Sequence, residues 1–229
     1  MAPSTPAVLS VAYAKTVASA PDIGYHAIPM DLDTLRARLR ARPTTPRSEW
    51  DSRAPGDTHP APIVDSPRAA AVLVPLYFDT AEWHLLLTQR TESVSTHKGQ
   101  VAFPGGRADP EDRDAVATAL RETEEEVGLP HAAVEVLGTL PAYTTVTNFV
   151  VTPVVALVTP PFTLALDSFE VAEAFEVPME FLMNPAHHRR HVMEYMGGER
   201  RFLSMPWGDY FIWGATAAMI RNLYRFLSE

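Results

Sequence analysis

The sequence predicts one α+β or α/β domain, in which helices cover a mixed β-sheet, preceded by an N-terminal arm. Short apolar runs rich in β-forming residues lie before and after one central amphipathic helix, and a second amphipathic helix closes the chain. Hydrophobic residues make up 46% of the 229 residues and charged residues 21%, which is ordinary for a chain with a hydrophobic core. We therefore expect an arm at residues 1–68 and the globular domain at residues 69–229.

Composition argues against several classes of function. The net charge of -9 disfavours broad binding to a nucleic-acid backbone, and no apolar run is long enough to span a membrane. The absence of cysteine excludes disulfides and thiolate metal sites, and is compatible with a reducing cytosol. The N-terminus lacks a basic start before its apolar part, so a secretory signal is not expected. We expect a cytoplasmic protein with no nucleic-acid or membrane partner.

The arm contains one clear element. Residues 1–29 show no period and are expected to be peripheral. In Met30–Ala41 the leucines recur at helical spacing, which predicts a short amphipathic helix. We expect this helix to pack on the main domain, with contact to a partner or substrate as the alternative. Residues 42–68 are rich in Pro, Asp, Ser and Thr, and are expected to form an extended connector.

Alternating and apolar runs predict the elements of the domain. A hairpin is expected to open it, a loose alternation over 170–178 leads into a short helix, and two adjacent glycines at 197–198 suggest a second hairpin. The expected strands are Ala69–Phe78, Trp83–Gln89, Gln100–Phe103, Val134–Leu140, Phe149–Thr159, a weaker Phe162–Leu166, Val192–Tyr195 and Arg201–Met205, and the expected helices are Asp114–Val127, Met179–Met183 and Ile212–Leu227.

The segment Gly105–Leu129, GGRADPEDRDAVATALRETEEEVGL, carries most of the functional information. On a helical wheel at about 100° per residue, Glu122, Glu125 and Glu126 fall on one flank of the buried face, and Glu124 falls on the opposite flank. Like charges at this spacing repel by about 0.2–0.5 kcal/mol per pair on an isolated helix. A divalent cation would remove the conflict, because hard cations prefer carboxylate oxygens. The segment therefore predicts a metal site.

The surroundings of the glutamates support this interpretation. Arg121 stands four residues before Glu125 and is expected to hold that carboxylate. The two glycines let the backbone approach closely, and the Gly106 carbonyl could join the metal ligands. Asp112 or Asp114 is expected to cap the helix. A solvated glutamate-rich helix is the alternative for the glutamates alone, but the glycine turn, the arginine and the helix stop at fixed offsets argue against it.

The segment resembles the Nudix box, in which Gly, five residues, Glu and seven residues precede Arg-Glu-aliphatic-x-Glu-Glu-x-Gly-aliphatic. Residues 121–129 match the second half, with Thr123 at the aliphatic position. In the first half Asp112 stands in place of Glu, and eight residues separate it from Arg121.

The stretch before the box resembles the signature of the coenzyme A diphosphatase branch. That signature reads LLTxR-S, three residues, Arg, three residues, Gly, three residues, FPGG. Residues 86–106 agree with it, except that Thr91 stands for the Ser and Ser95 for the Arg. The altered first half of the box also resembles this branch.

The resemblance implies a Nudix-type α/β/α sandwich with a mixed sheet and the Nudix loop-helix-loop. It implies hydrolysis of the pyrophosphate of coenzyme A (CoA), dependent on Mg²⁺ or Mn²⁺, to 3′,5′-ADP and 4′-phosphopantetheine. The alternatives are a pyrophosphatase acting on another nucleoside diphosphate derivative, such as ADP-ribose or NADH, and a nucleotide-binding module without turnover. The intact glutamates argue against the last. Relatives are often dimers, so a homodimer is expected.

The resemblance also implies roles for site residues. One of the box glutamates or a distal carboxylate would be the general base. Glu170 and Glu173 are preferred over Glu176 for the distal position, with a place on an exposed strand edge as the alternative for each. Basic residues around the box would bind phosphates, with a plain surface cation as the alternative for each. We expect the histidines of 187–191 to lie at a solvated helix end rather than in a metal or anion patch. The tryptophans of 207–213 are expected in the core rather than as a platform for adenine. The candidate site comprises the catalytic residues Arg121, Glu122, Glu125, Glu126 and Glu170, the metal ligands Glu122, Glu125, Glu126 and Gly106, and the substrate-binding residues Arg90, Lys98 and Arg107.

Overall fold

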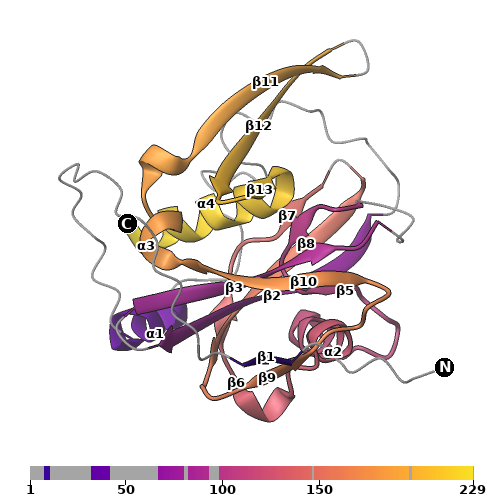
Figure 1. Cartoon of the computed structure of the whole chain (residues 1–229), viewed down its shortest axis with the longest axis vertical. Coiled ribbons are helices and arrows are strands. Elements are labelled where there is room, and N and C mark those ends of the chain that lie inside the picture. Colours follow the sequence, from indigo (N-terminus) through magenta and orange to yellow (C-terminus); the bar gives the residue numbers. More distant parts are fainter. Residues whose placement is uncertain are drawn as a thin grey trace.

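The centre of the computed structural model, which describes residues 8–10, 32–41, 67–79, 82–92, 98–145, 147–195 and 198–228, is a mixed sheet (Figure 1). Its main path runs in the order β10 (Val171–Pro178), β3 (Glu82–Arg90), β2 (Arg68–Asp79), β8 (Phe149–Val158) and β6 (Val134–Thr139). Strands β2 and β8 are parallel, and the other neighbours on this path are antiparallel. The expected opening hairpin and mixed sheet are confirmed.

Three short strands extend this sheet near the glycine pair. They are β4 (Val101–Ala102), which pairs with β3, β5 (Gly105–Arg107), which pairs with β2, and β7 (Tyr143–Thr144), which pairs with β8. The prediction of a simple glycine turn was incomplete, because Gly106 and Gly105 lie opposite Ala71 and Val72 of β2.

Strand β2 shows why both faces of the sheet are covered. Val74 and Leu76 join one hydrophobic cluster, while Leu73 and Tyr77 join the other. A strand that is buried on both faces reads as a nearly continuous apolar run rather than as an alternation, which is what residues 69–78 show.

Helices cover the two faces. Helix α2 (Ala115–Val127) packs on one face through its fully buried Ala119 and Val127. On the other face lie α4 (Gly214–Ser228) and the short α3 (Met179–Leu182) (Figure 1). The expected sandwich is therefore confirmed.

Helix α1 (Leu32–Ala41) packs on the domain, as expected for the first of its two interpretations. Leu35 and Leu39 are buried in the cluster on the α4 side, and α1 contacts β6. Two guanidinium nitrogens of Arg36 donate to the carboxylate of Glu135 at 3.1 and 2.6 Å. Residues 42–66 of the expected connector at 42–68 lie outside the described residues, so the division at residue 68 stays a prediction.

A short strand was missed in the N-terminal arm. Strand β1 (Val8–Ser10) pairs antiparallel with β9 (Thr163–Ala165). A strand of three residues has too few positions to show a period, so the sequence pattern gave no signal for it.

The C-terminal part adds a second sheet, of β11 (Arg189–Tyr195), β12 (Gly198–Trp207) and β13 (Tyr210–Trp213). The β11–β12 hairpin was expected, and Figure 1 shows it projecting away from the main sheet. The expected helix at Ile212–Leu227 began too early, since its first two residues belong to β13 and α4 begins at Gly214. Ile212 is fully buried, a position that fits either a strand or a helix, so periodicity alone did not separate them.

Candidate active site

Both ends of α2 are fixed by the residues that the sequence indicated. The Asp114 side chain accepts a hydrogen bond from the Ala117 amide at 2.9 Å and is the N-cap. At the other end, Gly128 has the left-handed φ of 70°, and its amide donates to the Glu124 carbonyl at 2.9 Å. These caps set where the helix begins and ends, and so which way its glutamates point.

Arg121 connects the acidic residues of the segment. Its NH1 donates to Glu122 Oε1 and Glu125 Oε2, each at 3.0 Å. Its Nε and NH2 donate to the two oxygens of Asp112 at 3.0 and 2.9 Å, and NH2 also reaches the Arg107 carbonyl at 3.2 Å. The expected contact with Glu125 is present, and Arg121 holds three further groups as well.

Asp112 supports Arg121 instead of capping the helix. Its carboxylate also accepts hydrogen bonds from the Thr118 hydroxyl and the Asp109 amide, each at 2.9 Å. The Arg121 guanidinium, with these donors, holds the pKa of Asp112 well below its usual range. The altered first half of the motif therefore still delivers an ionised carboxylate to the arginine.

The glycine pair lies against two of the glutamates. The Gly105 amide donates to Glu126 Oε2 at 3.0 Å. A Cβ at Gly106 would come within 2.4 Å of Glu122 Oε2, and a Cβ at Gly105, which has a φ of 145°, would come within 2.4 Å of the Ala71 carbonyl oxygen. Gly106 therefore permits the close approach of the backbone to the Glu122 carboxylate, and Gly105 permits the close approach to β2.

Arg90 brings the distal carboxylate to the box. Its NH1 donates to Glu126 Oε1 and its NH2 to Glu170 Oε2, both at 3.3 Å. The other distal candidates are placed elsewhere, because Glu173 accepts a hydrogen bond from Tyr210 and Glu176 accepts one from Tyr77. Of these three acidic residues, the structure brings only Glu170 to the glutamates of α2.

Burial shapes the electrostatics of the box. Glu126 is 5% exposed, and its burial raises the pKa of its carboxyl to about 7 despite the Gly105 and Arg90 hydrogen bonds. Burial also raises the pKa of Glu122, and the charges of Glu125 and Glu170 act in the same direction. Glu125 is more exposed. Ionising Glu122 and Glu126 is therefore costly without a cation.

The arrangement fits a divalent cation by its chemistry. In the described part of the chain, no three acidic or histidine side chains converge closely enough to form a complete metal centre. The possible ligand atoms at the box are oxygens, and the Glu122 carboxylate lies against Gly106. Burial raises the pKa of Glu122 and Glu126, which makes their charged forms unfavourable without a cation. Hard divalent cations bind such oxygen donors and stabilise their ionised form.

A cavity of about 460 Å³ opens beside the glycine pair. Arg90, Gly105, Gly106 and Arg107 line it, whereas the exposed Lys98 does not. Of the predicted basic residues, two therefore face this space.

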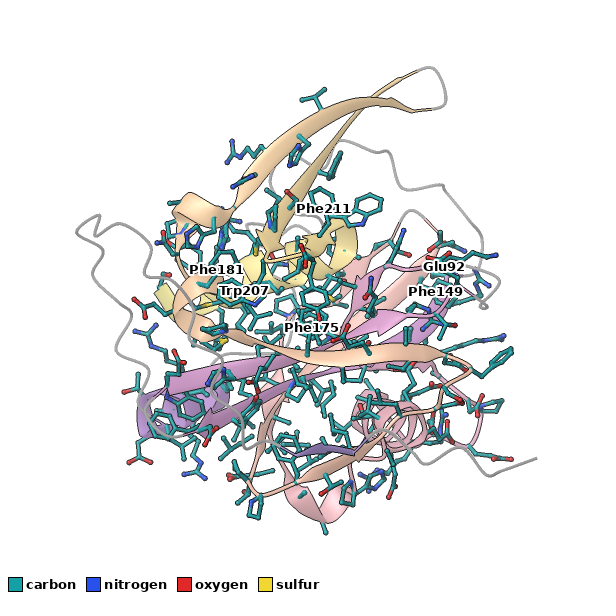
Figure 2. The ribbon with its side chains drawn as sticks, viewed as in Figure 1. Glu92, Phe149, Phe175, Phe181, Trp207 and Phe211 are labelled. Atoms are coloured by element: carbon teal, nitrogen blue, oxygen red, sulfur yellow. The ribbon has the colours of Figure 1, made fainter. Side chains whose placement is uncertain are left out.

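Sequence reasoning missed Tyr143 and Phe149 as residues of this cavity and preferred the core for Trp213. Tyr143, Phe149 (Figure 2) and Trp213 all line the cavity. Trp207, by contrast, does pack against the core, and its ring centroid lies 4.7 Å from that of Phe181. Strand pairing, which sequence periodicity does not reveal, places β8 beside β2 and β7 beside β8, and so brings their aromatic residues to the cavity.

Among the described residues the histidine cluster forms no metal patch, and it lies partly at a helix end, where His187 and His188 are half-buried. His187 Nδ1 lies 2.9 Å from the Phe181 carbonyl oxygen, and His191 Nε2 lies 2.7 Å from Ser204 Oγ. His188 contacts the Leu182 carbonyl oxygen and the guanidinium of Arg221, each at 2.7 Å. His187 is the last residue of the 3-10 helix η2 (Pro185–His187) and His188 is its C-cap, so the expected helix end is confirmed for these two, whereas His191 lies in β11.

The chain is similar to several known proteins. The model of the NUDIX domain matches residues 67–195. A Photorhabdus laumondii protein named "Uncharacterized Nudix hydrolase NudL" is 40% identical over 164 residues, which cover 72% of this chain and 87% of that protein. The protein of the same name from Escherichia coli strain K12 is 43% identical over 158 residues, covering 68% and 81%. A solved structure, the MutT protein from Methanosarcina mazei Go1, has a TM-score of 0.46 and 19% identity over 71% of this chain and 95% of that one.

None of the helices in the described ranges is both long and apolar enough to cross a membrane.

The match to the domain model covers more than half of the chain and includes the capped helix, the glycine pair and the glutamates. The chain therefore belongs to the Nudix hydrolases, diphosphatases that generally use divalent metal ions and act on small nucleotide derivatives.

Proposed function

We propose that the protein hydrolyses the pyrophosphate of CoA or its derivatives to 3′,5′-ADP and 4′-phosphopantetheine, with Mg²⁺ or Mn²⁺ as the cofactor. The proposal rests on one observation: the stretch that resembles the CoA branch and the glutamates of the box lie together in the structure. Arg90, Gly105 and Gly106 of the stretch that resembles the CoA branch line the cavity, and they also lie against Glu122 and Glu126 of the box.

We assign the metal to Glu122, Glu125 and Glu126, with the Gly106 carbonyl as a further ligand. When bound, the cation would neutralise the pyrophosphate and lower the pKa of the attacking water. Arg121 donates hydrogen bonds to Glu122 and Glu125 and so fixes the orientation of their carboxylates. Its role is to position the ligands, since the Asp112 carboxylate and the Arg107 carbonyl occupy the rest of its guanidinium.

Glu170 is our candidate for the general base. Its carboxylate shares Arg90 with Glu126, so it lies beside the box and not along the outer part of β10. A hydrogen bond of 3.0 Å from the Thr91 amide to the Glu170 carbonyl fixes the backbone at this point. A carboxylate so placed can accept the proton of the attacking water, and one of the box glutamates is the alternative base.

The basic residues are proposed to bind the phosphates. Arg90 and Arg107 line the cavity and can neutralise charge on the diphosphate. Lys98 is exposed in the loop before β4, close in sequence to the lining residue Gln100. We assign Lys98 to a phosphate at the rim of the cavity, where the 3′-phosphate of CoA is one candidate.

The experiment is a substrate comparison with Mg²⁺ or Mn²⁺ present, in which CoA, ADP-ribose, NADH and a dNTP are incubated with the enzyme and the products separated by chromatography. We expect CoA to give 3′,5′-ADP and 4′-phosphopantetheine at the highest rate, and dephospho-CoA to react more slowly. Preferred turnover of ADP-ribose or NADH would replace CoA by that substrate. If the compounds bind but none is turned over, the remaining interpretation is a nucleotide-binding module without catalytic activity.

A further inference from the structure

The cavity beside the glycine pair has two kinds of lining. Arg90, Gly106 and Arg107 give it cationic and backbone groups suited to a diphosphate. Phe149 and Trp213 give it aromatic surface that the diphosphate cannot use. A ligand that fills the cavity therefore needs a charged part and a flat apolar part.

Trp213 is held in a fixed position on the cavity wall. It is paired with Ser204 in the β12–β13 ladder, and its ring packs at 5.5 Å from Phe202 in an edge-on arrangement and at 6.4 Å from Phe211 (Figure 2 labels Phe211). The segment that follows is fixed as well, because the Thr216 hydroxyl donates to the Val101 carbonyl at 2.9 Å. A ring that is already immobile loses little entropy when a ligand stacks on it.

The half-buried Trp213 offers a better stacking surface than Phe149. One face of the Phe149 ring is covered by the guanidinium of Arg68, which lies 4.0 Å from the ring centroid. Indole has the larger aromatic surface, and base stacking on aromatic side chains is a strong contact that tolerates different bases. A pantetheine chain has no π-face and gains less from a flat indole.

We propose that Trp213 is the residue on which the nucleobase of the substrate stacks, while the diphosphate lies at the glycine pair. The inference rests on the proposed function for the identity of the substrate. Trp213 lies outside residues 67–195, which the Nudix domain model matches. The C-terminal segment of this chain would thus determine specificity for the nucleoside part of the ligand.

The test uses the two expected products as separate probes, because neither is turned over. Dissociation constants of 3′,5′-ADP and 4′-phosphopantetheine are measured by calorimetry for the wild type and for Trp213→Ala. We expect the affinity for 3′,5′-ADP to fall about 5- to 150-fold, as the loss of one stacked base predicts. The affinity for 4′-phosphopantetheine should not change.

Trp83→Ala is the matched control. Trp83 is also a half-buried tryptophan at a cavity, but that cavity is a different one, lined by Phe78 and Leu157. Its variant should bind both products as the wild type does. Trp213→Phe, which keeps a ring, should bind 3′,5′-ADP with intermediate affinity and should lose the quenching of tryptophan fluorescence that we expect 3′,5′-ADP to cause in the wild type.

Unchanged affinity for 3′,5′-ADP in Trp213→Ala, or in Trp213→Phe together with unchanged quenching, would overturn the inference. A selective loss of 4′-phosphopantetheine binding would also overturn it, by placing the other half of the substrate at Trp213. Measuring the binding of AMP distinguishes a failure of this inference from a failure of the proposed function. If CoA is not hydrolysed but AMP binding still weakens in Trp213→Ala, the base site stands and the proposed substrate fails.

Discussion

The Arg90 guanidinium donates a hydrogen bond to the carboxylate of Glu126 at 3.3 Å, so a positive charge already touches the most buried glutamate of the box. The same guanidinium reaches Glu170 at 3.3 Å and lines the cavity. Arg90 and a divalent cation at Glu126 would therefore compete for the same oxygen atoms. Freed from Glu126, the arginine would be available to a substrate phosphate in the cavity.

Arg90→Gln should bind Mn²⁺ more tightly, by roughly tenfold, because it removes a competing positive charge worth about 1.4 kcal/mol. Its turnover should fall about 10²- to 10³-fold, since a group that neutralises the diphosphate is lost. Mn²⁺ affinity is followed by the electron paramagnetic resonance signal of the free ion, and Arg90→Lys, which keeps the charge, is the control. Weaker Mn²⁺ binding in Arg90→Gln would show instead that Arg90 holds the ligands in place.

Gly106→Ala tests whether the glycine makes room for a metal ligand. The added Cβ would come within 2.4 Å of Glu122 Oε2, so the side chain of Glu122 has to move. We expect Mn²⁺ affinity to fall about 10- to 100-fold with little change in the melting temperature.

Gly105→Ala is the contrasting variant, because its Cβ would meet backbone atoms of β2 and its φ of 145° is strained for other residues. It should lower the melting temperature. Normal Mn²⁺ binding by a folded Gly106→Ala protein would remove Glu122 from the metal ligands.

The local parts of the site were predictable from the sequence. The N-cap Asp114, the C-terminal Gly128 and the Arg121–Glu125 contact all lie within one helix or at its ends, where spacing determines which side chains meet. The same holds for most strands, whose ends differ from the expected ones by no more than one residue.

The long-range parts were not predictable in the same way. Arg90 and Glu170 are 80 residues apart, and they meet because β3 and β10 are neighbours, with Val171 opposite Arg90. Trp213 reaches the cavity because the β12–β13 hairpin turns back before α4. Periodicity shows which face of an element is buried, but not which element lies beside it.

Asp112→Asn should reduce activity although Asp112 lies behind the metal ligands. The substitution removes the charge that pairs with Arg121 through two hydrogen bonds, so Arg121 holds Glu122 and Glu125 less firmly. We expect kcat/KM to fall about 10- to 100-fold. Asp109→Asn is the control in the same loop, because its carboxylate is exposed and 3.8 Å from Arg121. Equal effects of the two substitutions would contradict a specific role for Asp112.

Glu126→Gln should abolish turnover and yet stabilise the metal-free protein at pH 8. The pKa of Glu126 is raised to about 7 in the fold, above the ordinary value of 4.5. The folded state therefore holds the proton more tightly, and the wild type loses stability as the pH rises from 4.5 through 7. The glutamine variant avoids this loss, which we expect to be about 1–3 kcal/mol in the free energy of unfolding.

Urea denaturation in EDTA at pH 5 and pH 8 measures this difference. Glu124→Gln is the matched control, since Glu124 is exposed and points away from the box. It should leave both activity and the pH dependence unchanged. A Glu126→Gln protein that is less stable than the wild type at pH 8, or that turns over substrate, would contradict the assignment.

His188 should make the protein less stable in mild acid. Its ring lies between the Leu182 carbonyl and the Arg221 guanidinium, and burial lowers the pKa of His188 to about 4, with the charges of Arg221 and His187 acting in the same direction. The unfolded state, with a histidine pKa near 6.5, binds more protons between pH 4 and 6.5. Stability from the neutral ring is therefore complete above pH 6.5 and is lost as the pH falls toward 4.

His188→Gln, which does not titrate, should flatten this decline, whereas His131→Gln at an exposed position should keep the wild-type profile. Melting temperatures measured from pH 7.5 to 4.5 test the prediction. Because the two proteins would differ only where His188 gains a proton, their curves should run parallel above pH 6.5 and converge or cross below it. An unchanged slope in His188→Gln would mean that other groups cause the acid sensitivity.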